Sequence, residues 1–149
     1  MNVKDIVEYG VYSLNNNLAE LVEVMKKWDE DNLVKVRVHA NQEVITERVV
    51  TSDELFPIEL SEDILKALSF LEVNGKLWGL IDEHYFFLKA KDVVMIKNNG
   101  IFNYVSADPK SYYGCRFIPM PYLHQLQNLI GRINVDLLIN IHNHATSTT

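Results

Sequence analysis

The feature that most constrains this chain is an alternation of apolar and charged residues with a period of two. Val34, Val36 and Val38 alternate with a lysine and an arginine, which is the pattern of a strand that buries one face. Residues 44–50 are rich in β-branched side chains and predict a second strand. Residues 29–32 have a turn-forming composition, so we expect these strands to belong to an antiparallel sheet.

The segment from Leu18 to Trp28 fits two structures. Its apolar residues follow helical spacing, yet Val22 and Val24 alternate with Glu23 as in a strand. Because a tight turn and a clear strand follow, we favour one arm of a β-hairpin, and a helix remains the alternative. Residues 1–58 are therefore predicted to form a small, strongly bent antiparallel sheet of SH3-like type.

The second half of the chain carries signals for two short helices. Ser61 is a good N-cap, and the two acidic residues after it suit the positive end of the helix dipole. Two prolines precede a second helix, predicted over residues 122–130, which Gly131 is well placed to end. Both helices are expected to bury one apolar face.

Strands are predicted between and after these helices. Asn74-Gly75 is interpreted as the opening of a second β region, and Asn98-Asn99-Gly100 as a hairpin turn. Alternating apolar residues over 133–141 predict a closing strand. The other predicted strands cover residues 76–81, 85–90, 93–97 and 101–105.

Together these elements predict an α+β fold that is mostly antiparallel β with two short helices. We expect a β-rich, SH3-like subdomain at residues 1–58, an α+β subdomain at 59–142 and a tail at 143–149. A chain of 149 residues buries enough surface to need no disulfide or metal. Its one cysteine, Cys115, excludes an internal disulfide framework and a Cys-rich zinc site.

Charge and hydropathy narrow the classes of partner. The net charge is −6 and the pI is near 5.3, which disfavours general DNA or RNA binding because phosphate neutralisation supplies much of that affinity. The N-terminus lacks the apolar core of a signal peptide, and no apolar stretch is long enough to span a bilayer. We therefore expect a cytoplasmic protein without membrane partners.

Two stretches resemble a family of small proteins from Bacteroides-type phages and prophages. Residues 122–129 read Tyr-Leu-His-Gln-Leu-Gln-Asn-Leu, and residues 57–65 read Pro-Ile-Glu-Leu-Ser-Glu-Asp-Ile-Leu, and both are similar to signatures of that family. Ser69 stands where the family often has glycine before a phenylalanine. The resemblance implies a phage or prophage accessory protein that acts inside a bacterial host cell. It implies no catalytic residues.

The loop around residues 112–116 is the most suggestive candidate for ligand binding. Tyr112, Tyr113 and Arg116 are residue types enriched at binding surfaces, since tyrosine stacks on bases and arginine pairs with phosphate through a planar fork. Lys89 and Lys91 lie in the same half of the chain and could add positive potential. The competing interpretation is a loop whose aromatic side chains cover a small core.

Histidines offer the remaining candidates for chemistry. His124 lies on the second predicted helix, where it is either a hydrogen-bonded structural histidine or a ligand-binding donor or acid–base group. Asp82-Glu83-His84 is interpreted as a hydrophilic turn, and His142-Asn143-His144 as part of a solvated tail. No catalytic set, metal site or cofactor is predicted from them.

The leading hypothesis is a non-enzymatic phage-type protein with an anti-defence role. The chain has no Gly-rich phosphate loop and no nucleophile elbow. It would bind and sequester a nucleotide-like signal or dock on a host protein, and a homo-oligomer is expected because identical subunits can enclose a ligand between them. The alternatives are a nucleotide- or phosphodiester-processing enzyme that uses His124, and a pure protein-interaction or assembly module.

Overall fold

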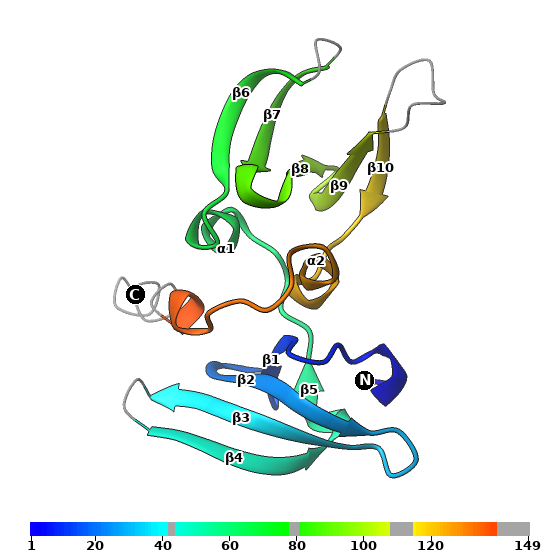
Figure 1. Ribbon diagram of the computed structural model, residues 1–149, viewed down its shortest axis with the longest axis vertical. Helices are drawn as coiled ribbons and strands as arrows, with labels where there is room; N and C mark the ends of the chain where they lie inside the picture. The colour runs from blue at the N-terminus through cyan, green and yellow to red at the C-terminus, as the bar shows by residue number, and fades with distance from the viewer. Residues whose placement is uncertain (42–43, 78–80, 108–114, 140–149) are drawn as a thin grey trace. The chain divides into compact units, whose positions relative to one another are not determined.

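The computed structural model describes residues 1–41, 44–77, 81–107 and 115–139 (Figure 1). The chain forms two compact units. Unit 1 combines residues 1–59 with the C-terminal part from Tyr122 onward, and unit 2 is Leu60–Pro121. Among the described residues, no helix has both the length and the apolar composition needed to cross a membrane.

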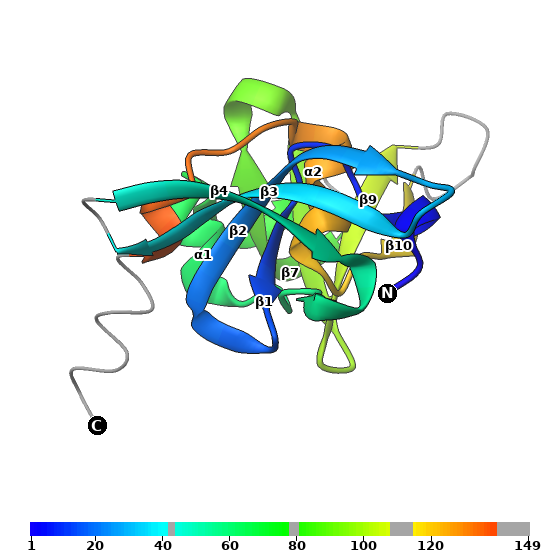
Figure 2. The ribbon, with the colours of Figure 1, turned by 90° about the horizontal axis from the view of Figure 1, so that it is seen from below.

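Unit 1 is built on a five-stranded antiparallel sheet with the strand order β4-β3-β2-β1-β5. Its long strand β2 pairs with β1 through its first half and with β3 through its second half, with a register shift between Val24 and Lys26. Figure 2 shows β2, β3 and β4 as neighbouring curved strands. The elements are η1 (Val3–Asp5), β1 (Val11–Leu14), β2 (Asn17–Trp28), β3 (Leu33–Asn41), β4 (Val44–Thr51), η2 (Ser52–Glu54) and β5 (Leu55–Phe56).

The core of unit 1 lies on one face of this sheet, as the alternation of valines predicts. Val22, Val24, Val34 and Val36 are fully buried in one apolar cluster. Residues 18–28 are therefore a strand, as favoured from the sequence, and the helical alternative is wrong. The reason is that a strand places the valines of β2 in the core and turns Glu23 to the opposite face.

The helix α2 (Leu123–Ile130) belongs to unit 1. It contacts β1, buries Leu123 and Leu126 completely, and ends at Gly131, whose φ is +83°. The amide of Leu123 donates a hydrogen bond of 2.8 Å to the carbonyl of Ile58. The sequence-based division grouped residues 122–142 with the second subdomain, whereas in the structure the part from Tyr122 onward belongs to unit 1.

The predicted closing strand over 133–141 is wrong in its described part. Residues 136–139 form a helical turn, in which the amides of Leu138 and Ile139 donate to the carbonyl of Val135. These three residues are all buried. Their i, i+3, i+4 spacing gives one apolar helical face. Val135 and Ile139 also fit the alternation of a strand, but the burial of Leu138 and the 39% exposure of Leu137 follow the helical period.

Unit 2 is a helix followed by an antiparallel meander with the strand order β10-β9-β8-β7-β6. The Ser61 hydroxyl accepts the amide of Ile64 at 3.2 Å, as expected of an N-cap. Asn99 and Gly100, at φ +53° and +81°, form the predicted turn. The elements are α1 (Glu62–Ala67), β6 (Leu71–Leu77), β7 (Ile81–Leu88), η3 (Lys89–Lys91), β8 (Val93–Asn98), β9 (Ile101–Ala107) and β10 (Cys115–Pro119).

Two interpretations of the sequence in unit 2 are wrong: the opening of the β region at Asn74-Gly75 and the hydrophilic turn at residues 82–84. Asn74 and Gly75 lie inside β6, opposite His84 and Glu83 of β7, so residues 82–84 are strand as well. Strand pairing overrides the turn propensity of an Asn-Gly pair when both flanking segments continue the ladder. The predicted class is nevertheless confirmed, since the described chain is mostly antiparallel β with few short helices, and the SH3-like type stays a prediction.

Candidate functional site

The structure brings part of the predicted binding residues to one end of the unit 2 sheet. Arg116 is exposed on β10 and lies opposite Ser106 near the end of β9. Lys89 and Lys91 are exposed in η3, just before β8 begins. Because β8 and β9 are antiparallel, the start of β8 and the end of β9 share one end of the sheet. Tyr112 and Tyr113 lie outside the described residues.

His124 lies on α2 in unit 1, between two tyrosine rings. Its ring centroid is 5.2 Å from that of Tyr12 and 5.9 Å from that of Tyr122, and both pairs are stacked. Burial lowers the pKa of His124, and the nearby Asp5 carboxylate opposes this shift. The Nδ1 atom is buried without a hydrogen-bond partner in the described part of the chain. This environment favours a neutral ring packed between aromatic side chains.

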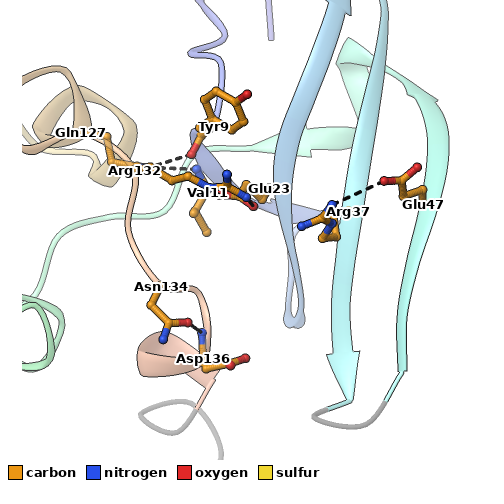
Figure 3. A network of polar contacts seen from close by, with 9 residues as sticks. All are labelled: Tyr9, Val11, Glu23, Arg37, Glu47, Gln127, Arg132, Asn134 and Asp136. Carbon is orange, nitrogen blue, oxygen red and sulfur yellow. Dashed lines mark hydrogen bonds and ion pairs between the residues drawn. The ribbon is translucent and has the colours of Figure 1, made fainter.

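A carboxylate that sequence reasoning missed lies in unit 1. Glu23 is only 2% exposed, although β2 turns it to the face opposite the valine core. Arg132 donates to it twice, from Nε to Oε2 at 2.8 Å and from Nη2 to Oε1 at 2.9 Å (Figure 3). This bidentate geometry compensates the buried charge and fixes the plane of the guanidinium.

The guanidinium of Arg132 lies over the ring of Tyr9, with 4.6 Å between Cζ and the ring centroid. The Arg132 side chain is 49% exposed and Tyr9 is 40% exposed. We call this stacked pair the Tyr9–Arg132 platform. An arginine has five N–H donors, and Glu23 engages two of them. The other three N–H donors of Arg132 therefore belong to a half-exposed guanidinium whose orientation Glu23 already fixes.

Gln127 fixes the backbone at Tyr9, the aromatic member of the platform. Its side-chain oxygen accepts the amide of Val11 at 2.9 Å, and its Nε2 donates to the carbonyl of Tyr9 at 3.0 Å (Figure 3). The Tyr9 amide donates to the carbonyl of Val24 at 2.7 Å. These bonds keep Tyr9 at φ +61°, a left-handed conformation that is costly for a bulky side chain and is often found at functional sites.

Gly10 is required next to the platform because the space around it is closed. A Cβ atom added there would lie 2.7 Å from the carbonyl oxygen of Val7 and 2.9 Å from Cε2 of Tyr12. We predict that Gly10→Ala lowers the free energy of unfolding by about 1–3 kcal/mol, since overpacking forces backbone or ring shifts. Urea denaturation measures this, and an unchanged midpoint would contradict the crowding.

Other titratable groups of the described residues form exposed ion pairs. In the described ranges, no three His, Cys, Asp or Glu side chains are grouped closely enough to hold a metal ion. His84 contacts Glu72 at 2.7 Å and Lys66 contacts the same carboxylate at 3.0 Å, on an exposed part of unit 2. Both partners lower the pKa of Glu72, which is the behaviour of a surface ion-pair cluster.

No family model matches the chain, and the comparisons with curated proteins and with solved structures found no match either. The resemblance to phage proteins and the SH3-like type therefore stay predictions. The platform escaped sequence reasoning because its members are far apart in the chain: Tyr9, Glu23 and Arg132 carry no shared motif. The usable signal was Glu23, a single carboxylate between two core valines.

Proposed function

We propose that the protein is a non-enzymatic binding protein that holds a nucleotide-like ligand on the Tyr9–Arg132 platform. The observation that carries this proposal is the half-exposed guanidinium that stacks on Tyr9 and is fixed by buried Glu23. An arginine prepared in this way loses little side-chain entropy when a ligand binds. Preorganisation of this kind suits binding, and it requires no reacting group.

The chemistry of the platform selects a ligand that is both planar and anionic. One face of the guanidinium is covered by Tyr9, so a nucleobase would stack on the opposite face. The N–H donors left by Glu23 suit phosphate oxygens. Because Glu23 balances the charge of Arg132, recognition rests on directed hydrogen bonds and stacking more than on long-range attraction. The net charge of −6 further disfavours long nucleic acids relative to a small nucleotide.

The biological setting we propose is a phage-type accessory protein in the bacterial cytoplasm. The resemblance of residues 57–65 and 122–129 to phage proteins supports it. Sequestering a nucleotide-like signal would then serve an anti-defence role. The platform is contained in one unit of one chain, and a homo-oligomer remains an expectation that the native mass measurement below tests.

A second candidate, docking on a host protein, is favoured by the surface of unit 2. The strand register places Leu71, Phe87 and Val94 on one face of the sheet, because directly opposed residues share a face. Ile101 and Phe117 lie on this same face, and Leu71, Ile101 and Phe117 are 61%, 45% and 46% exposed. Exposed apolar side chains gathered on one face are typical of protein contacts.

The enzyme alternative would depend on His124. Stacking between Tyr12 and Tyr122 and the lowered pKa of the ring favour a packing role for it. His124→Gln distinguishes a packing role from a catalytic role. If His124 only packs, the variant is less stable but releases a bound ligand as the wild type does. If His124 is catalytic, the variant loses turnover of a bound nucleotide.

The first test is native mass spectrometry of the purified protein with cyclic dinucleotides, ADP-ribose and mononucleotides. We expect one of these to be retained intact, and the same spectrum gives the oligomeric state. Arg132→Lys keeps the charge but loses the planar fork, and Tyr9→Leu loses the ring; each is expected to weaken the retained ligand at least about tenfold. Arg37→Lys, on the neighbouring strand, is the matched control. Equal retention of the ligand by the wild type and all variants would contradict the proposal that the platform binds it. The proposal would also be contradicted if no protein, the wild type included, retained a ligand.

A further inference from the structure

The sheet face that carries the Glu23–Arg132 ion pair continues into a cationic region that the proposed function does not use. Directly opposed residues of neighbouring strands share a face, and Arg37 of β3 lies opposite both Glu23 of β2 and Glu47 of β4. Figure 3 shows Glu23, Arg37 and Glu47 following one another across these strands. Lys35 is two residues from Arg37 along β3, so it lies on the same face about 7 Å away.

In this region two lysines lie directly opposite each other. Because the register of β2 shifts between Val24 and Lys26, Lys26 is paired with Lys35. Like charges in this arrangement destabilise a sheet. The Lys35 ammonium is 3.1 Å from the carboxylate of Glu47, which Arg37 also contacts. Stability therefore does not explain why the two lysines are opposed, whereas the binding of an anion does.

Trp28 adds an aromatic ring beside the lysines. It lies opposite Leu33, which is two residues from Lys35 on β3, and it is therefore on the same face. Trp28 is half-buried, and the Nζ atom of the exposed Lys26 is 5.1 Å from the centre of its ring. An aromatic ring beside cations is an arrangement that proteins use to bind a base together with its phosphate. We call Lys26, Trp28 and Lys35 the Trp28 subsite.

Two features set the length of the ligand that fits this face. The register places Trp28 four residues of β3 away from Glu23, which is about 13 Å. A ligand with a single base cannot place a base at both ends of this distance, whereas two nucleotide units joined through phosphate can. The turn that follows exposes Asp29, Glu30 and Asp31, which would repel a longer polyanion.

We propose that the Trp28 subsite binds the second unit of a ligand in which two nucleotides are joined through phosphate. The first base stacks on Arg132, the linking phosphate lies near the two lysines, and the second base packs on Trp28. Placement of the first base rests on the proposed function. Binding at the subsite itself rests only on the side chains of β2 and β3.

The subsite also supplies an attraction that the platform lacks. The charge of Arg132 is balanced by Glu23, whereas Lys26 faces an uncharged ring. A phosphate group that reaches the lysines therefore neutralises positive charge that the protein leaves uncompensated.

Isothermal titration calorimetry with two probes tests the subsite. The probes are adenosine diphosphate and a linear diadenylate with a 5′-phosphate, which carry two phosphates each and differ by the second nucleoside. We expect the wild type to bind the diadenylate at least about tenfold more tightly, since stacking of one base contributes about that much. Equal affinities for the two probes would overturn the proposal.

Three variants identify the residues that provide this gain. Trp28→Leu removes the ring and is expected to lose the gain. Lys26→Gln is expected to weaken the diadenylate at least about threefold, because one phosphate contact is lost. Lys4→Gln is the matched control, since Lys4 is exposed in η1, where the neighbouring Val3 belongs to the valine core on the other face. A gain that persists unchanged in both Trp28→Leu and Lys26→Gln would contradict the subsite. If Trp28→Leu does not fold, Lys26→Gln decides.

The NMR signal of the Trp28 indole N–H separates this proposal from the proposed function. If the diadenylate shifts the signal saturably and Arg132→Lys does not weaken its binding, the proposed function fails and the subsite stands. If adenosine diphosphate binds through Arg132 and the diadenylate gains nothing, the subsite fails alone. If neither probe binds, both proposals fail.

Discussion

Replacing Gln127 with leucine is expected to lower the free energy of unfolding by about 3 kcal/mol. Gln127 is 4% exposed and joins the amide of Val11 to the carbonyl of Tyr9, across more than a hundred residues of sequence. Leucine has a similar size but no polar atoms, so both backbone groups lose their partner. Each buried unpaired group costs about 1–3 kcal/mol. Chemical denaturation monitored by the far-UV signal measures the loss.

Asn128→Leu is the matched control for that substitution. Asn128 is the next residue on α2 and is exposed, so its replacement should change stability by less than about 0.5 kcal/mol. If Gln127→Leu is as mild as this control, the two hydrogen bonds do not join α2 to the start of β1 as described.

Arg132→Met is expected to lower the free energy of unfolding by about 2–3 kcal/mol. The substitution keeps much of the aliphatic side chain but leaves Glu23, at 2% exposure, as an uncompensated buried carboxylate. Breaking one partner of a buried pair costs about 3–5 kcal/mol. We expect less here because the Arg132 side chain is half exposed, so water can reach the gap it leaves.

Arg37→Met tests whether burial of the carboxylate is what matters. Arg37 is on the adjacent strand and contacts the exposed Glu47 at 3.6 Å. An exposed ion pair contributes little, so this variant should be clearly less destabilised than Arg132→Met. Equal losses in the two variants would contradict the assignment of Arg132 as the main partner that compensates the charge of Glu23. Glu23→Gln in the Arg132→Met background should then recover stability, because the amide carries no charge.

Much of the fold could be predicted from local patterns. The alternating valines of β2 and β3 define the core face, the Ser61 cap starts α1, and Asn99-Gly100 makes the turn between β8 and β9. These features succeed because each one is decided by the backbone geometry or burial of a few neighbouring residues.

The sequence-based predictions were wrong or incomplete where two local patterns compete, or where contacts between residues far apart in the chain determine the structure. Residues 133–139 fit both a strand and a helical period, and burial of Val135, Leu138 and Ile139 settled it. Asn74-Gly75 has turn propensity but continues the ladder with β7. The platform could not be predicted, since Glu23 and Arg132 are 109 residues apart and only the fold brings them together.

The measurement that tests the platform most directly is an NMR titration of the protein with ADP-ribose and a cyclic dinucleotide. We expect saturable shifts of the Arg132 Nε–H and of the amides of Tyr9 and Gly10, with Arg116 on β10 unaffected. Saturable shifts confined to Arg116 and its neighbours would move the binding site to unit 2. No saturable shift with either nucleotide would contradict the proposal that the Tyr9–Arg132 platform holds a nucleotide-like ligand.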